Sequence, residues 1–169
     1  MRKLFISLVL ICLSVMANAQ VVAKSELSGI KPGSVIGFEC DFSDAVIMGM
    51  DEEAFGKYET DWTTDKPTIV SNFVSGINNK LDGVLIVGNF KEVKYTLKVS
   101  VKNVAKTGYM LCDAKIVDSK GNTCFIVKQV NGGTEPPVLP GTKLAKMKMW
   151  ALLTGRSLGG VLRSEYLNQ

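Results

Sequence analysis

The side chains best suited to chemistry in this 169-residue chain are nine acidic residues within positions 39–65, a segment whose only basic residue is Lys57. The candidate ligands of a hard cation in this acidic segment are Asp51, Glu52, Glu53 and Asp61. Ca²⁺ is bound by several carboxylate and carbonyl oxygens, but the spacing here matches no EF-hand loop. We therefore favour a solvated acidic loop without a metal, and we expect no cofactor.

A pair of carboxylates could also serve a glycosidase-like hydrolase, with Tyr58 and Trp62 as the aromatic residues of its groove. Other catalytic arrangements are poorly supported. The chain has no histidine, which excludes mechanisms in which histidine activates serine or cysteine. Gly83 and Gly88 have the spacing of a phosphate-binding loop, but the Lys-Ser/Thr pair that should follow is missing. We expect no enzymatic activity.

Lysines dominate residues 91–128, which carry eight lysines against three acidic residues. Lys94, Lys98 and Lys102, the lysine stripe, recur every four residues and would stand ~13 Å apart on one side of a strand. The stripe is our candidate binding surface for an anionic glycan, an envelope protein or the acidic segment of a second copy. The alternative is that these lysines only keep the exposed face of the sheet solvated and protect its edges from pairing with other strands. Because opposed charges balance, we expect no nucleic acid partner.

Residues 1–20 have the three parts of a secretory signal peptide: a basic start, an apolar run over 4–15 and the cleavage site Ala17-Asn18-Ala19. We predict cleavage, export, and a location in the periplasm or on the outer surface. No later stretch is apolar for long enough to span a bilayer, so we expect no transmembrane segment after cleavage.

Residues 21–34 are expected to be a linker, and residues 35–169 a single domain. Alternating apolar and polar residues predict strands at 35–50, 84–87, 93–102, 110–116 and 123–130. Apolar residues three or four positions apart predict helices at 67–81 and 142–167. The fold class is α+β: a mainly antiparallel sheet of about five strands, in the order β-α-β-β-β-β-α, with both helices packed on one face. Residues 51–66 are expected to be a loop.

Three cysteines follow the signal peptide, Cys40, Cys112 and Cys124, and an odd number is no complete disulfide framework. We predict free thiols, because neither a two-residue nor a three-residue hairpin loop brings Cys112 and Cys124 to bridging distance. A Cys112–Cys124 bridge is the alternative.

The last helix carries Gly155 and Gly159 together with Trp150 and Leu158. Each interior glycine costs a helix ~1 kcal/mol relative to alanine, so two of them indicate close packing, which we expect to be against the sheet. The alternative is a helix that lies on a membrane surface, with Trp150 at the interface.

Four local features give the chain a resemblance to a class of small exported envelope proteins of Bacteroides-type bacteria. They are Cys40-Asp41-Phe42-Ser43-Asp44-Ala45, the turn Asp118-Ser119-Lys120-Gly121, the pair Gly132-Gly133, and Leu158-Gly159 in the last helix. The order of elements is also similar to the small α/β domains of curli-secretion and Tol-type proteins. The resemblance implies a non-enzymatic envelope protein with a binding or assembly role, without known catalytic residues. The alternatives are a carboxylate-based hydrolase or calcium-binding module using the acidic segment, and a structural subunit of a homo-oligomer.

Overall fold

A computed structural model describes residues 20–134 and 141–169 of the chain. Residues 1–19 of the predicted signal peptide and residues 135–140 of the proline-rich stretch lie outside the described residues. The described residues form three helices and a mixed sheet of seven strands. The α+β class is therefore confirmed, whereas five strands and two helices were too few.

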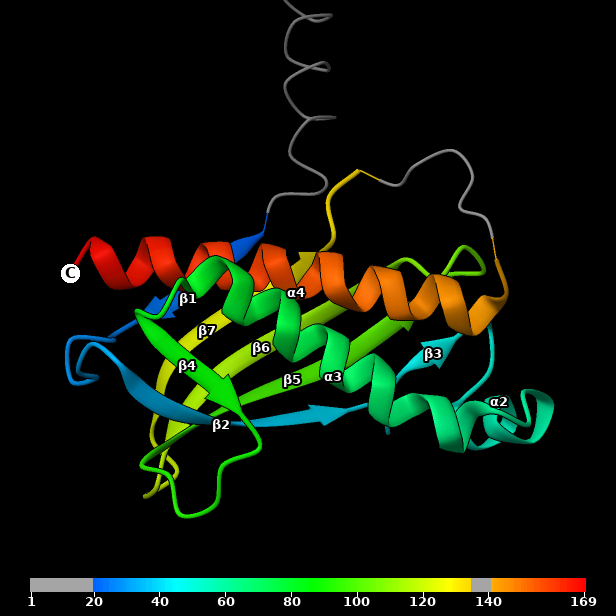
Figure 1. Ribbon diagram of the computed structural model, residues 1–169, viewed down its shortest axis with the longest axis horizontal. Helices are drawn as coiled ribbons and strands as arrows, with labels where there is room; N and C mark the ends of the chain where they lie inside the picture. Colours follow the sequence, from blue (N-terminus) through cyan, green and yellow to red (C-terminus); the bar gives the residue numbers. More distant parts are fainter. Residues whose placement is uncertain (1–19, 135–140) are drawn as a thin grey trace, which may run out of the picture.

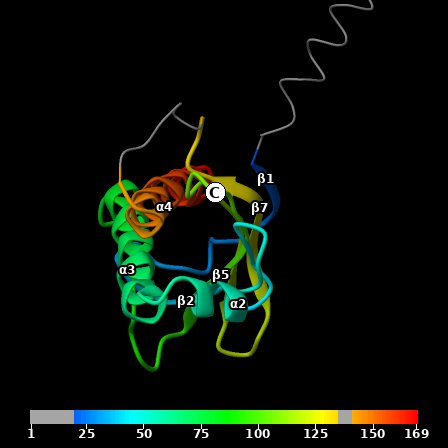
Figure 2. The ribbon, with the colours of Figure 1, turned by 90° about the vertical axis from the view of Figure 1, so that its right-hand side faces the viewer.

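The helices are α2 (Glu52–Tyr58), α3 (Trp62–Leu81) and α4 (Lys143–Leu167). The strands are β1 (Val21–Ser25), β2 (Ser34–Asp41), β3 (Val46–Ile47), β4 (Leu85–Gly88), β5 (Tyr95–Val104), β6 (Met110–Asp118) and β7 (Thr123–Asn131). The two long helices, α3 and α4, lie side by side over the sheet (Figure 1). The turned view places both on the same face, as predicted (Figure 2).

The sheet has the strand order β1-β7-β6-β5-β2-β4, and β3 pairs with β5. The pairs β1–β7, β7–β6 and β6–β5 are antiparallel, but β2 is parallel to both β4 and β5, and β3 is parallel to β5. The expectation of a mainly antiparallel sheet is therefore wrong for the part of the sheet that contains β2, β3 and β4. The reason is the crossover through α3, because a helix between two neighbouring strands brings them together in parallel.

Residues 21–34 belong to the folded domain rather than to a linker, and their first five residues form strand β1. Strand β1 pairs with β7 along the sheet edge, and the following Leu27 and Ile30 are buried in the core. The sequence did not predict this strand, because it has no alternation of apolar and polar residues. Its two neighbouring valines, Val21 and Val22, are both exposed, so neither face of the strand is apolar and buried.

The expected loop at 51–66 contains α2 and the first residues of α3. Asp51 caps α2, since its carboxylate accepts a hydrogen bond of 2.7 Å from the backbone N–H of Ala54. Glu52 and Glu53 then lie in the first turn, where negative charge favours a helix N-terminus. A cap and two acidic residues thus explain a helix that has only one buried side chain, Phe55.

Trp62 is a core residue at the start of α3, not a loop residue. Its ring makes edge-to-face contacts with Phe42 and Phe55, at centroid distances of 5.4 and 5.3 Å. These contacts anchor the N-terminal end of α3 over the end of β2, and α3 therefore begins five residues before the predicted start at Pro67.

The interior glycines of α4 let it pack directly on α3. A Cβ at Gly155 would lie 2.2 Å from the carbonyl oxygen of Phe73, and one at Gly159 would lie 2.4 Å from that of Ile77. On the facing helix, a Cβ at Gly76 would lie 2.2 Å from the carbonyl oxygen of Leu152. The expectation of close packing is confirmed, but its partner is α3 rather than the sheet.

The core interpretation of α4 is also confirmed, because Trp150 and Leu158 are fully buried. Within the described ranges, no helix has the length and apolar character needed to cross a membrane.

The β6–β7 hairpin keeps its two cysteines apart. Cys112 pairs with Val130, whereas the Sγ of Cys124 lies 3.6 Å from the carbonyl oxygen of Ile116. Four residues of strand, or ~13 Å, separate these positions. Two register shifts within the hairpin produce a pairing that neither predicted loop length would give. All three described cysteines are free thiols.

Candidate functional site

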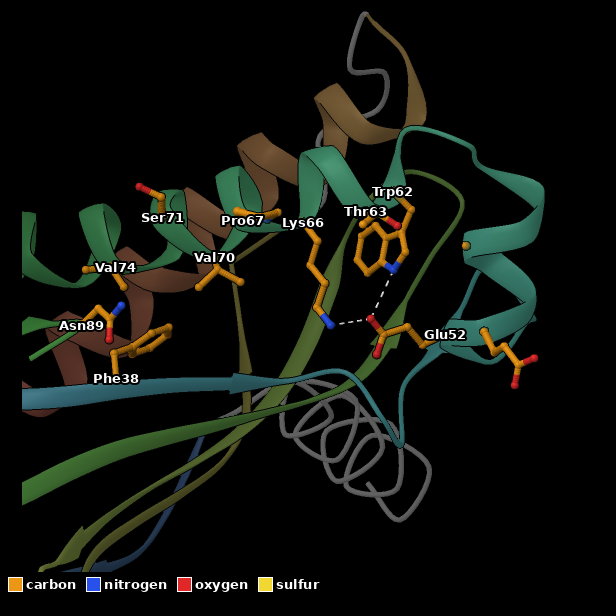
Figure 3. A pocket seen from close by; sticks show the side chains of 12 residues that line it. Phe38, Glu52, Trp62, Thr63, Lys66, Pro67, Val70, Ser71, Val74 and Asn89 are labelled. Atoms are coloured by element: carbon orange, nitrogen blue, oxygen red, sulfur yellow. Dashed lines mark hydrogen bonds and ion pairs between the residues drawn. The ribbon is translucent and has the colours of Figure 1, made fainter. Parts of the chain in front are cut away.

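A trough of about 890 Å³ lies between α3 and β2, and we call it the α3–β2 groove. Its apolar wall is formed by Val70 and Val74 of α3 and by Phe38 of β2, whose side chains point into the same space (Figure 3). All three side chains are half-buried. The ring of Phe38 lies 6.1 Å from that of the buried Phe73, so packing beneath the groove supports this wall.

The groove exists because β2 is longer than its neighbour β4. Strand β4 pairs with residues 34–37 of β2, while β5 pairs on the opposite side as far as Asp41. Beyond Gly37, no strand of the described chain lies on the β4 side of β2. Helix α3 therefore passes over a stretch of sheet whose edge is open.

The α2 end of the groove carries a hydrogen-bonded cluster of charged and aromatic side chains. The Oε1 atom of Glu52 lies 2.5 Å from Nζ of Lys66 and accepts a hydrogen bond of 3.2 Å from the indole N–H of Trp62 (Figure 3). Nζ of Lys66 also lies 5.3 Å from the ring centroid of Phe42, within the range of a cation–π interaction. These contacts hold both charged groups in place.

The four candidate metal ligands have other roles in the structure. Asp51 caps α2, Glu52 pairs with Lys66, and Glu53 lies 2.6 Å from Lys57. Asp61 occupies the N-cap position of α3 without a side-chain hydrogen bond. Asp51, Glu52 and Glu53 share a small open depression with Ser43, which Asp61 does not line. In the parts of the chain with described positions, no three acidic or cysteine side chains form a metal-binding group.

Lys98 and Lys102 of the lysine stripe are on the outer face of the sheet, opposite the helices, whereas Lys94 lies just before β5 begins at Tyr95 and is not part of that strand. Lys94 and Lys102 are exposed, and Nζ of Lys98 lies 2.8 Å from a carboxylate oxygen of Glu39 on the neighbouring strand β2. Lys98 and Lys102 line a shallow cavity of about 490 Å³ with Asp113 and other side chains of this face. The acidic segment therefore meets the lysine stripe at Glu39 within one chain.

Cys40 lies close to the groove but is not a nucleophile at neutral pH. Burial raises the pKa of its thiol to about 12, against the lowering effect of the nearby Lys66 ammonium group. Burial also raises the pKa of the Cys112 thiol. Thiols react as thiolates, so both groups are inert near neutral pH.

The residues that make the apolar wall could not be recognised from the sequence. Phe38 belongs to an alternating strand, and Val70 and Val74 belong to the apolar face of a helix, which are patterns of core residues. They become a site only because β4 ends before β2 does. Glu52 was recognised, but for a metal rather than for its contacts with Lys66 and Trp62.

No family model matches the sequence, and no curated protein matches it. Among solved structures, a PelC dodecamer from Paraburkholderia phytofirmans is 11% identical with a TM-score of 0.42, over 83% of this chain and 98% of that chain. A variant dodecamer of the same protein is 10% identical with a TM-score of 0.43, over 83% and 96%. A DUF330 protein from Xanthomonas campestris is 9% identical with a TM-score of 0.39, over 86% and 90%. These likenesses are weak in sequence and in geometry, so the function has to be sought in the groove and surfaces of this chain.

Proposed function

We propose that this chain is a non-enzymatic binding protein of the cell envelope whose ligand lies in the α3–β2 groove. The observation that carries the proposal is the groove itself, an apolar wall of Phe38, Val70 and Val74 with a polar cluster at one end. Ligand sites are typically concave and mainly apolar, with a few polar groups that orient the ligand. The signal-peptide pattern and the resemblance to exported envelope proteins support the location.

The charged groups at the groove support binding rather than catalysis. A general acid or base must exchange a proton with its substrate. The Glu52 carboxylate is instead engaged by Lys66 and by the indole of Trp62, and the Cys40 thiol stays protonated. A carboxylate-based hydrolase would require these contacts to break before reaction.

The neutral apolar fluorophore N-phenyl-1-naphthylamine tests the groove directly. We expect its fluorescence to rise on binding, with energy transfer from Trp62 at the end of the groove. The variant Val70→Arg places a charged side chain in the apolar wall and should abolish the signal. Thr68→Arg, at an exposed position of the same helix outside the groove, is the matched control and should bind normally. Equal binding to both variants would refute the groove as the site.

A homo-oligomeric subunit is a second candidate function, favoured by the two edges of the sheet. Edge strand β1 exposes Val21 (51%) and Val22 (36%), and at the other edge Ile86 of β4 (42%) lies beside Val35 of β2 (46%). Open strand edges with apolar side chains are suited to pairing with another chain. Light scattering should then give a mass that is a multiple of the monomer mass, and a monomer at all concentrations would reject this candidate.

A further inference from the structure

The backbone beside the groove indicates what kind of ligand it takes. We propose that the occupant is an extended peptide that adds to residues 38–41 of β2 as an additional strand, with basic side chains toward α2. This inference rests on the proposed function, since it assigns the occupant of the same groove.

Among the described residues, the backbone of residues 38–41 pairs with a strand on one side only. Strand β5 covers that side from Gly37 to Asp41, whereas β4 has already ended at Gly88. Successive residues of a strand direct their N–H and C=O groups to opposite sides, so every second residue of this stretch faces the open side. A peptide strand ~4.8 Å from β2, in the track that continues β4, would pair with these groups.

The side chains beside this track predict the pattern of the peptide. Phe38, Val70 and Val74 form an apolar wall on the helix side, and the opposite face of β2 carries the exposed Glu39 and Asp41. Alternate side chains of a strand point to opposite faces of a sheet. A peptide with apolar side chains at every second position would therefore bury them against α3 while its polar side chains stay in water.

The charge at the α2 end predicts the peptide's polar groups. The open depression there is lined by Asp51, Glu52, Glu53 and Ser43, and it adjoins the groove through Glu52 and Glu53. At this end the ammonium group of Lys57 pairs with Glu53 and that of Lys66 pairs with Glu52. Asp51 has no ion pair among the described residues, so one negative charge remains uncompensated there. A lysine or arginine of the peptide is the complementary group for this end, whereas a glutamate would be repelled.

Labelled synthetic peptides test the inference by fluorescence anisotropy. The probe is acetyl-Lys-Val-Thr-Val-Thr-Lys-amide, and its comparison peptide has glutamate in place of both lysines. Two further peptides keep the lysines and are N-methylated at alternate backbone amides, one in each of the two alternations. The protein is tested as the chain that follows the signal peptide, together with the variants Val70→Arg and Thr68→Arg.

Strand pairing has a characteristic result with these probes. One N-methylated peptide should bind about tenfold more weakly than the parent, because it loses the donors that face β2, while the other should bind nearly as well. The glutamate peptide should also be at least about tenfold weaker. Val70→Arg should abolish binding and Thr68→Arg should not. Hydrogen exchange should slow at those backbone amides of residues 38–41 that face the open side when the parent peptide is bound.

Other results would overturn the inference and show which part has failed. If both N-methylated peptides bind as well as the parent, the groove holds side chains without strand pairing. If the glutamate peptide binds equally well, the assigned charge preference is wrong. If no peptide binds while N-phenyl-1-naphthylamine does, the proposed function stands and the peptide assignment falls. If neither kind of probe binds, both fall.

Discussion

Glu52 is a residue through which α2 contacts α3. It begins α2, and its carboxylate binds Lys66 and Trp62 of α3. The contact therefore links α2 directly to α3 at the end of the α3–β2 groove. By contrast, the neighbouring Glu53 pairs with Lys57 within α2 alone.

Replacing each glutamate by glutamine should separate these two roles. Glu52→Gln removes a charge from a half-buried pair and should lower the free energy of unfolding by about 1 kcal/mol. Glu53→Gln is the matched control, because its pair with Lys57 is exposed (81% and 75%), and the change should stay within about 0.5 kcal/mol. Urea denaturation measures both, and equal losses would contradict the proposed difference.

Cys40 should make stability depend on alkaline pH. Its thiol has a pKa of about 12 in the folded chain and an ordinary value of 9.0 when exposed, so above pH 9 the unfolded chain releases a proton that the folded chain keeps. The contribution of the protonated Cys40 thiol to the free energy of unfolding is complete below pH 9. It is lost as the pH rises toward 12, and the free energy of unfolding then falls by at most about 1.4 kcal/mol per pH unit. In urea denaturation at pH 8 to 11, Cys40→Ala should show a shallower decline than the parent chain. Parallel declines would mean that the thiol ionises in the folded state.

At the scale of elements, the contact between α3 and α4 depends on the absence of side-chain atoms. Backbone of one helix lies directly against backbone of the other at Gly76 and Gly155. Helices at such close approach tolerate no Cβ, whereas Gly160, on the same helix, has open space around it.

Two glycine-to-alanine changes on α4 should therefore have opposite signs. Gly155→Ala would place a Cβ 2.2 Å from a carbonyl oxygen, and separating the helices should cost about 1–3 kcal/mol or more. Gly160→Ala meets nothing within 4 Å and should stabilise the helix by up to about 1 kcal/mol. Thermal unfolding followed by circular dichroism gives both values. A stabilising Gly155→Ala would show that the helices are further apart than described.

The elements that could be predicted from the sequence are those with one wet and one buried face. Strands β5 to β7 show this alternation. The last helix, predicted at 142–167, spans Lys143–Leu167, since its apolar face follows a stretch rich in glycine and proline. Strand β1 carries no such pattern, and a short helix such as α2 buries too little to create one. Parallel pairing of β2 was unpredictable because the choice of strand partners is a property of the whole chain. For the same reason, no local sequence pattern predicts the α3–β2 groove, because it depends on where β4 ends beside β2.

For the whole molecule, the charge distribution is mostly balanced within one chain. Lys98 pairs with Glu39 across the sheet, Lys148 lies 2.8 Å from Asp65, and Lys66 pairs with Glu52. The acidic segment thus finds several of its cations on other elements of the same chain, which leaves less charge for contacts between copies. Lys94 and Lys102 stay exposed and without an ion pair among the described residues.

Changing Lys94, Lys98 and Lys102 together to glutamine tests what the lysine stripe contributes. The free energy of unfolding should change by no more than about 0.5 kcal/mol per site, because all three ammonium groups are at the surface. Any self-association or binding to anionic heparin beads should weaken, and the part that is lost should be the part that salt removes. Unchanged retention at low salt would mean that these lysines only solvate the sheet. Glu39→Gln is the control, because it removes the intrachain partner of Lys98 and adds no positive charge of its own.

The pairing of β1 with β7 has a consequence for how this chain acquires its structure. Val21 pairs with Lys128, so strand β1 can join the sheet only after β7 has been synthesised. Loop closure of this length is costly and slow compared with local contacts. The edge of the sheet that β1 occupies therefore stays incomplete until synthesis has passed β7. The export that the pattern of residues 1–20 predicts requires an unfolded chain, and late completion of the sheet is compatible with that requirement.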